Sequence, residues 1–145
     1  MTESRLSAVT TAAKALGHPA RARVLAMLSG GPLCVCQMTA VLAAASSTVS
    51  EHLRELKRAG LLVEEKNGKF ISYRLAPSGN AARWVQVVLA GLAGDQVAAA
   101  DAELVKRLRR ISVEEFAASG RRLPAVSASK TSGRKSKRSP RNAKA

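Results

Sequence analysis

The chain of 145 residues is poor in aromatic side chains, in cysteine and in long apolar runs. Aromatic residues make up 3% of the sequence and hydrophobic residues 46%, so Ala, Leu and Val must supply most of a core. Such a core favours packed helices. No apolar run approaches the ~20 residues of a membrane span. The N-terminus (Met1–Arg5) lacks the basic-then-apolar pattern of a signal peptide, so we expect a cytoplasmic protein with no membrane partner.

Acidic residues are scarce as well, and they are missing from the C-terminal segment. The chain has 24 Lys and Arg against 10 Asp and Glu, a formal net charge of +14. From Arg121 onward there are nine Lys and Arg and no acid. Such a surface attracts polyanions. When Lys and Arg neutralise the phosphates of a nucleic acid, counterions are released, and this release favours binding. The composition predicts nucleic-acid binding, with a folded domain over residues 1–112 and a basic, disordered tail over 113–145.

Hydrophobic periodicity predicts a series of helices in the first part of the chain. Pro19 fits the first turn of the second helix, where its missing N–H is no loss. Ser46 and Ser47 are N-cap candidates for the fourth helix. The predicted helices cover residues 4–17, 19–28, 36–43 and 46–59.

The period then changes from helical to alternating. Residues 61–66 and 69–75 alternate around Asn67-Gly68, a pair typical of a type I′ hairpin turn. A helical pattern resumes at Ala81 and restarts at Asp95. This order predicts a mainly α fold with a β-hairpin wing, that is, a winged helix-turn-helix.

In a winged helix-turn-helix the second helix enters the major groove of DNA, and its N-terminal residues meet base edges. Val49, Leu53 and Leu56 share one face of residues 46–59 and are expected to pack in the core. The outward face begins with hydroxyls and continues with cations, among which Arg54 suits a forked contact to guanine. A solvated face, and for His52 a structural role, remain the alternatives. The candidate DNA-binding residues are Ser46, Ser47, Thr48, Ser50, Glu51, His52, Arg54, Lys57, Lys66 and Lys69.

These residues carry a family resemblance. The stretch from Ser46 to Leu61 resembles the recognition helix of the ArsR/SmtB family of metal- and metalloid-responsive repressors, and the hairpin resembles its wing. The segment from Ala15 to Leu25 is similar to the family's entry into its second helix. The resemblance covers roughly residues 5–95. It implies a homodimer, paired through its first and last helices, that binds an inverted repeat in double-stranded DNA.

Cys34 and Cys36 are the only two cysteines. The run from Leu33 to Met38 resembles the Cys-Val-Cys element with which arsenic-responsive members of that family bind trivalent arsenic, a soft ion that needs thiolates. Thr39 stands where the family pattern often has a third cysteine. The resemblance therefore implies arsenite completed by water or a small thiol, or a methylated arsenical, as the inducer.

The spacing of the two cysteines has a mechanical consequence. On a regular helix, residues two apart point ~200° away from each other. We therefore expect one ion to hold both sulfurs only if the start of the helix at 36–43 is extended or unwound. Because that helix supports the recognition helix, ion binding should favour the DNA-free state.

Several alternatives remain open at this point. The thiols suit other soft ions (lead, cadmium or antimony), a redox signal, or simple packing. Zinc fits less well, since it prefers four ligands and the terminal helices have no histidine. A nonspecific basic DNA-binding protein is a second function class, with a steep salt dependence. The sequence contains no catalytic triad order, phosphate-binding Gly loop or metal-binding His pair, so we expect neither an enzyme nor a constitutive cofactor.

Overall fold

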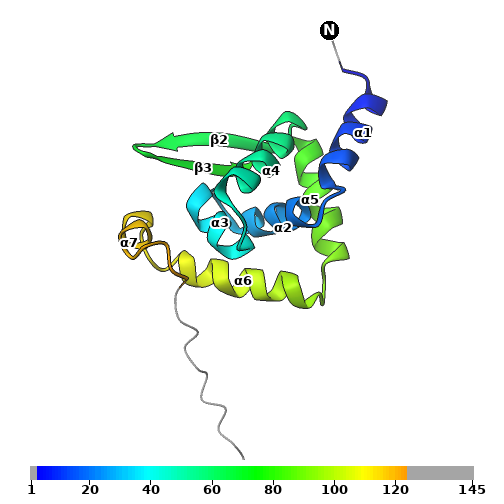
Figure 1. Ribbon diagram of the computed structural model, residues 1–145. Helices are drawn as coiled ribbons and strands as arrows, with labels where there is room; N and C mark the ends of the chain where they lie inside the picture. Colours follow the sequence, from blue (N-terminus) through cyan, green and yellow to red (C-terminus); the bar gives the residue numbers. More distant parts are fainter. Residues whose placement is uncertain (1–2, 124–145) are drawn as a thin grey trace, which may run out of the picture.

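The computed structural model describes residues 3–123, which form a helical body with a small sheet projecting from it (Figure 1). The predicted fold class, a winged helix-turn-helix, is confirmed. The elements are α1 Arg5–Leu16, α2 Pro19–Met27, η1 Leu28–Gly30, β1 Leu33–Cys34, α3 Val35–Leu42, α4 Ser46–Arg58, β2 Leu62–Asn67, β3 Phe70–Leu75, α5 Gly79–Gly91, α6 Gln96–Leu108 and α7 Val113–Ala118.

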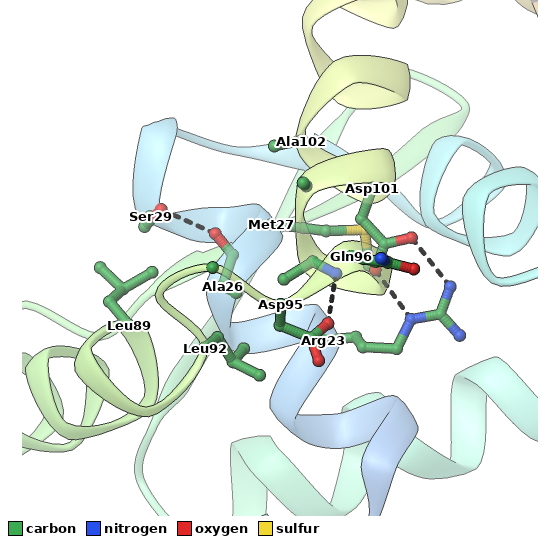
Figure 2. Close-up of a pocket in the computed structure, with 13 residues that line it drawn as sticks. Arg23, Ala26, Met27, Ser29, Leu89, Leu92, Asp95, Gln96, Asp101 and Ala102 are labelled. Carbon is green, nitrogen blue, oxygen red and sulfur yellow. Dashed lines mark hydrogen bonds and ion pairs between the residues drawn. The ribbon is translucent and has the colours of Figure 1, made fainter.

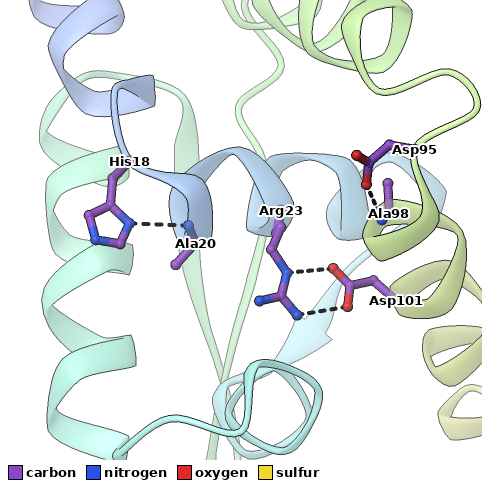
Figure 3. Close-up of polar contacts among 6 residues, drawn as sticks. All are labelled: His18, Ala20, Arg23, Asp95, Ala98 and Asp101. Atoms are coloured by element: carbon purple, nitrogen blue, oxygen red, sulfur yellow. Dashed lines mark hydrogen bonds and ion pairs between the residues drawn. The ribbon is translucent and has the colours of Figure 1, made fainter.

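Side chains that accept hydrogen bonds from the first free N–H groups fix several helix starts. Ser4 caps α1 and Asp95 caps α6. His18 caps α2, where its Nδ1 accepts the Ala20 N–H at 3.1 Å (Figure 3). Pro19 occupies the first turn of α2, as the sequence predicted. These side chains therefore fix the residue at which each of the three helices begins.

The turn between α3 and α4 corrects one prediction. The N-cap of α4 is Ala45, which has no side-chain cap bond, and both Ser46 and Ser47 lie inside the helix. Ala43 has a φ of 50° in the left-handed region, which turns the chain sharply before Ala45 extends it. The capping prediction was therefore wrong, because the turn ends one residue before the serines. The N–H groups of the first turn of α4 receive no bond from a capping side chain, which suits a phosphate.

The wing belongs to a three-stranded antiparallel sheet in the order β1-β3-β2. The sequence did not predict β1, which is only two residues long. The hairpin turn lies at Gly68-Lys69, since Asn67 pairs with Phe70. Gly68 has a φ of 60° and Lys69 has no positive φ, a pattern that fits type II′ and corrects the predicted type I′ turn at Asn67-Gly68.

The core lies where α4 packs on α1, α2 and α3. Val49, Leu53 and Leu56 on α4 are fully buried, as predicted. Leu25, Met38 and Leu61 belong to the same cluster. Burial of this stripe fixes the rotation of α4 about its axis and so decides which side chains face outward.

Helix α6 runs back across the body and packs against α2 and α3 (Figure 1). The Arg23 guanidinium donates two hydrogen bonds to the buried Asp101 carboxylate, at 2.7 and 2.8 Å (Figure 3). At the other end of α6, the Arg109 guanidinium donates to backbone carbonyls. Its acceptors are Met27, Gly31 and Pro32, at 3.5, 2.8 and 2.9 Å.

The segment predicted to begin the disordered tail at residue 113 starts with an ordered helix. Ser112 and Glu115 form a reciprocal capping box at the start of α7, and Phe116 is fully buried. The disorder predicted for 113–118 is therefore corrected, because one aromatic anchor ties this turn to the core. The basic segment from 124 to 145 lies outside the described residues. Within the described part of the chain, no helix is long and apolar enough to cross a membrane.

Candidate functional site

The outward face of α4 presents the polar residues expected of a DNA-reading helix. Ser46, Ser47 and Thr48 are exposed at its start, and Ser50 is partly exposed. Lys66 and Lys69 at the tip of the wing are exposed too, and Figure 1 shows the wing extending beyond the helical body. Hydroxyls, free N–H groups and cations are therefore spread along one helix and the adjoining hairpin. This arrangement suits base and phosphate contacts together.

His52 does not belong to this face, so its predicted DNA contact is corrected in favour of the structural alternative. The residue is buried, and its ring lies 4.3 Å from the ring of His18, between centroids. Its Nδ1 accepts a hydrogen bond from Nε of Arg21 at 3.1 Å. The position three residues after Val49 turns the side chain toward the start of α2, where it packs instead of meeting DNA.

Two predicted DNA-contacting cations have acidic partners. Arg54 pairs with Glu51 at 2.9 Å, both exposed. Lys57 Nζ lies 3.0 Å from Oε2 of Glu64 on β2, and the same oxygen accepts the Tyr73 hydroxyl at 3.2 Å. The hydrogen bond from Lys57 lowers the pKa of Glu64, so this carboxylate is charged at neutral pH. Sequence reasoning missed Glu64 and Tyr73, because only strand register brings them together.

The two thiols lie at the junction of β1 and α3. Their Sγ atoms are 3.2 Å apart, and both residues are buried. Cys34 ends the strand with extended backbone, whereas Cys36 is in the first helical turn, so the change of direction brings the sulfurs together. The Gln37 Oε1 accepts the Cys34 N–H at 2.8 Å and fixes this corner. The sulfurs meet because the backbone at Cys34, just before α3, is extended, while α3 itself is not unwound. That one ion holds both sulfurs stays a prediction.

Burial and the neighbouring Cys34 raise the pKa of Cys36 to about 11, so its thiol is protonated at neutral pH. A neutral thiol is slow to oxidise but can still exchange its proton for a soft ion. Two bonds of ~2.3 Å at the angle of about 100° of a three-coordinate, pyramidal ion place sulfurs about 3.5 Å apart. The pair therefore fits a soft ion after a shift of a few tenths of an ångström.

A third protein ligand is missing near the thiols. Thr39, at the position of the family's third cysteine, donates its hydroxyl to the Val35 carbonyl at 2.8 Å. Among the described residues, no group of three or more His, Cys, Asp or Glu could hold a metal ion. A closed zinc site with four protein ligands therefore does not fit these residues, whereas an ion that accepts two thiolates and an outside ligand does.

A cavity of about 500 Å³ opens beside the thiol pair, and Cys34 lines it. Its walls come from strand β3 of the wing, with Phe70 and Ser72, from Ile111 after α6, and from Val113 at the start of α7. A second cavity of about 400 Å³ lies between α2, α5 and α6 (Figure 2). Its lining is largely apolar, and its buried carboxylate, Asp101, is already paired with Arg23. Only the first cavity meets a predicted site residue.

Comparisons with known proteins agree with this geometry. A family model described as "Bacterial regulatory protein, arsR family" matches residues 18–63. The HTH-type transcriptional regulator CmtR of Mycobacterium tuberculosis is 40% identical over 91 residues, which cover 61% of this chain and 77% of CmtR. The arsenic resistance transcriptional regulator ArsR1 of Pseudomonas putida is 35% identical over 80 residues, 54% of this chain and 61% of ArsR1.

Two further matches bear on sensing and assembly. A cadmium resistance transcriptional regulatory protein CadC homolog of Staphylococcus aureus is 38% identical over 63 residues, 43% of this chain and 52% of the homolog. The chain thus spans less than two thirds of ArsR1 and of the CadC homolog. The homodimeric winged helix-turn-helix domain Mb0332 of Mycobacterium bovis superposes with a TM-score of 0.55 at 25% identity, covering 66% of this chain and 93% of the domain. The chain belongs to the arsR family of bacterial regulatory proteins, whose fold is that of DNA-binding transcriptional regulators and not of enzymes.

Proposed function

We propose that the protein is a homodimeric transcriptional repressor that leaves an inverted-repeat operator when trivalent arsenic binds Cys34 and Cys36. One observation carries the proposal: two buried thiols lie 3.2 Å apart at the corner that joins the wing sheet to α3. Helix α3 packs on α4. Any change of this corner therefore acts on the helix that reads DNA.

The inducer is arsenite or a trivalent organoarsenical. Trivalent arsenic forms three bonds, of which two go to the thiols and the third to a hydroxyl, a small thiol or a carbon substituent. The cavity beside Cys34 leaves room for that third group. The arsenic resistance regulators among the relatives support this choice of element.

The homodimer rests on exposed apolar side chains of α1 and α5. Leu6 and Val9 on α1 are 76% and 51% exposed, and Val87 on α5 is 62% exposed. Such side chains, clustered on two helices on the side of the molecule away from the wing tip (Figure 1), suit a partner surface. Helices α1 and α5 are the first and last helices of the segment that resembles the family, so they are the proposed pairing surface.

A second candidate inducer is another soft metal ion, favoured by the likeness to the CadC homolog. A redox signal is disfavoured, because burial keeps the Cys36 thiol protonated. A nonspecific DNA-binding protein would bind every sequence alike, with affinity set by salt.

The test is fluorescence anisotropy of labelled DNA from upstream of the protein's own gene. The complex is formed in reducing buffer and then titrated with arsenite, methylarsenite and cadmium. We expect release at one arsenical per protomer, and none from Cys34→Ser/Cys36→Ser, which should still bind the DNA. Thr39→Ser, which keeps the hydroxyl, is the control. Release that survives the loss of both thiols would disprove the sensing site.

A further inference from the structure

The thiol corner and the recognition helix are joined by a second route, which runs through the wing. In the sheet, Leu33 is the register partner of Tyr73 and Cys34 is the partner of Ser72. Tyr73 is in turn directly opposite Glu64. The strand that carries one of the thiols is therefore paired with the strand that carries the Tyr73 phenol.

The phenol reaches the recognition helix through one carboxylate. The Tyr73 hydroxyl donates to Oε2 of Glu64 at 3.2 Å, and Lys57 Nζ donates to the same oxygen at 3.0 Å. Tyr73 is buried, whereas Lys57 keeps 51% of its side chain exposed. A buried phenol thus holds a carboxylate in one position, and that carboxylate holds a cation on the outward face of α4.

We propose that Tyr73 and Glu64 are positioning residues that transmit the state of the thiol corner to Lys57. This inference rests on the proposed function only for the identity of the inducer. Lys57 can bind a DNA phosphate only when its ammonium group is shared with, or released by, the Glu64 carboxylate. The position of this carboxylate therefore affects the affinity for DNA. A shift of β1 that moves Tyr73 changes that placement.

The distance that the two Sγ atoms must move apart sets the size of the movement at the thiol corner. They lie 3.2 Å apart and must separate to about 3.5 Å around a three-coordinate, pyramidal arsenic with ~2.3 Å bonds at an angle of about 100°. Cys34 is confined by its pairing with β3 and by the bond from its N–H to Gln37. The strand therefore has to move with the sulfur, and a two-residue strand has few bonds to resist it.

The neighbouring position on the same hairpin supplies a matched control. Among the described residues, Glu65 pairs with Arg74 across the strands and makes no ion pair to α4, whereas Glu64 pairs with Lys57. Glu64→Gln and Glu65→Gln each remove one charge from β2. Only the first removes a partner of α4.

The experiment measures the DNA dissociation constant of the full chain with and without saturating arsenite, and arsenite binding itself by titration. We expect Tyr73→Phe and Glu64→Gln to bind arsenite as the wild type does. The ratio of the two dissociation constants should fall about three- to tenfold, within the usual range of coupling between sites. Glu65→Gln should keep the wild-type ratio. An unchanged ratio in Tyr73→Phe and Glu64→Gln, or an equal fall in Glu65→Gln, overturns the proposal.

A second measurement needs no inducer. A double-mutant cycle combines Tyr73→Phe with Lys57→Gln and follows DNA affinity alone. We expect the Lys57 substitution to have a different effect in the two backgrounds, by about threefold or more. Additive effects would show that Tyr73 does not position Lys57, even if arsenite releases the wild type. If arsenite does not release the wild type from DNA, the proposed function is contradicted. The double-mutant cycle still decides whether Tyr73 positions Lys57.

Discussion

The Nε–H of Arg21 points at Nδ1 of His52, 3.1 Å away, so this ring nitrogen must carry no proton. Burial, His18 and Arg21 lower the pKa of His52, while Glu51 opposes them. Because the folded-state pKa is the lower one, the unfolded chain binds the proton first as the pH falls. The stabilisation is therefore complete above the ordinary histidine pKa of ~6.5 and is lost as the pH falls below it.

We predict from this pair that the free energy of unfolding decreases between pH 7.5 and pH 5.5, as followed by urea denaturation. His52→Asn keeps an acceptor near Nδ1 and removes the titration, so part of this slope should disappear. His18→Asn keeps the helix cap but removes one group that lowers the pKa of His52, so it should reduce the slope only in part. An identical pH slope in His52→Asn and the wild type would contradict the prediction.

Arsenic and divalent soft metals should differ in how their binding depends on pH. Arsenite enters as As(OH)₃, and two thiols displace two waters, so the thiol protons leave in those waters and none is released. A divalent cation instead expels the protons of thiols such as Cys36, whose pKa is raised to about 11. We expect cadmium affinity to rise about tenfold per pH unit for each proton released, and arsenite affinity to stay nearly constant. Calorimetric titrations at pH 6.5 and 7.5 measure both.

The cavity beside Cys34 should distinguish arsenicals by the size of their substituent. Val113→Phe places a ring in that cavity, so release by phenylarsine oxide should need at least several-fold more inducer, while release by arsenite stays near wild type. Ala102→Leu, in the cavity of Figure 2, serves as control. Equal weakening of both inducers by Val113→Phe would mean that the substituent points elsewhere.

Removing only one partner of the ion pair between α2 and α6 should lower the free energy of unfolding. Asp101 is 5% exposed, and both of its oxygens are bonded to Arg23. Asp101→Ala leaves a partly buried guanidinium without a partner, and we expect a loss of about 2–4 kcal/mol in unfolding free energy. The double variant Arg23→Met/Asp101→Leu should recover much of that loss. Urea denaturation of the three proteins provides the comparison.

The basic segment beyond the described residues should act on all DNA alike. It carries seven Lys and Arg from residue 124 onward and no acid. Deleting 124–145 should weaken binding to operator and to unrelated DNA by similar factors and should flatten the dependence of affinity on salt. A change in sequence preference would show that this segment reads bases.

Periodicity predicted the parts of the fold that repeat along the chain. The stripe of Val49, Leu53 and Leu56 gave the orientation of α4, and the alternating residues of the wing gave the hairpin. Periodicity could not predict β1, because two residues form no period and are defined only by their partners on β3. The same limit explains His52, which lies at the edge of the buried stripe and faces inward because His18 and Arg21 meet it there.

The candidate site residues could be named from local sequence, whereas their arrangement in space could not. Local sequence identified Cys34 and Cys36, but their convergence depends on a change from strand to helix between them. Likewise, the hairpin was expected at Asn67-Gly68, and pairing of Asn67 with Phe70 moved the turn by one residue. Contacts distant in sequence, such as that of Arg21 with His52, had no local signal.

The contacts by which α6 holds α2 and the loop after it also have a consequence for synthesis of the protein. Arg23 and Asp101 are 78 residues apart in the sequence, and Arg109 and Pro32 are 77 apart. A chain emerging from the ribosome can form α2 and α3 early, and β1 once β3 has emerged, but the loop before the thiols stays unanchored until α6 has emerged. Contacts of such long range form late and slowly. Newly made chains therefore pass through a period in which Cys34 and Cys36 exist without their final support, open to soft ions before the fold is complete.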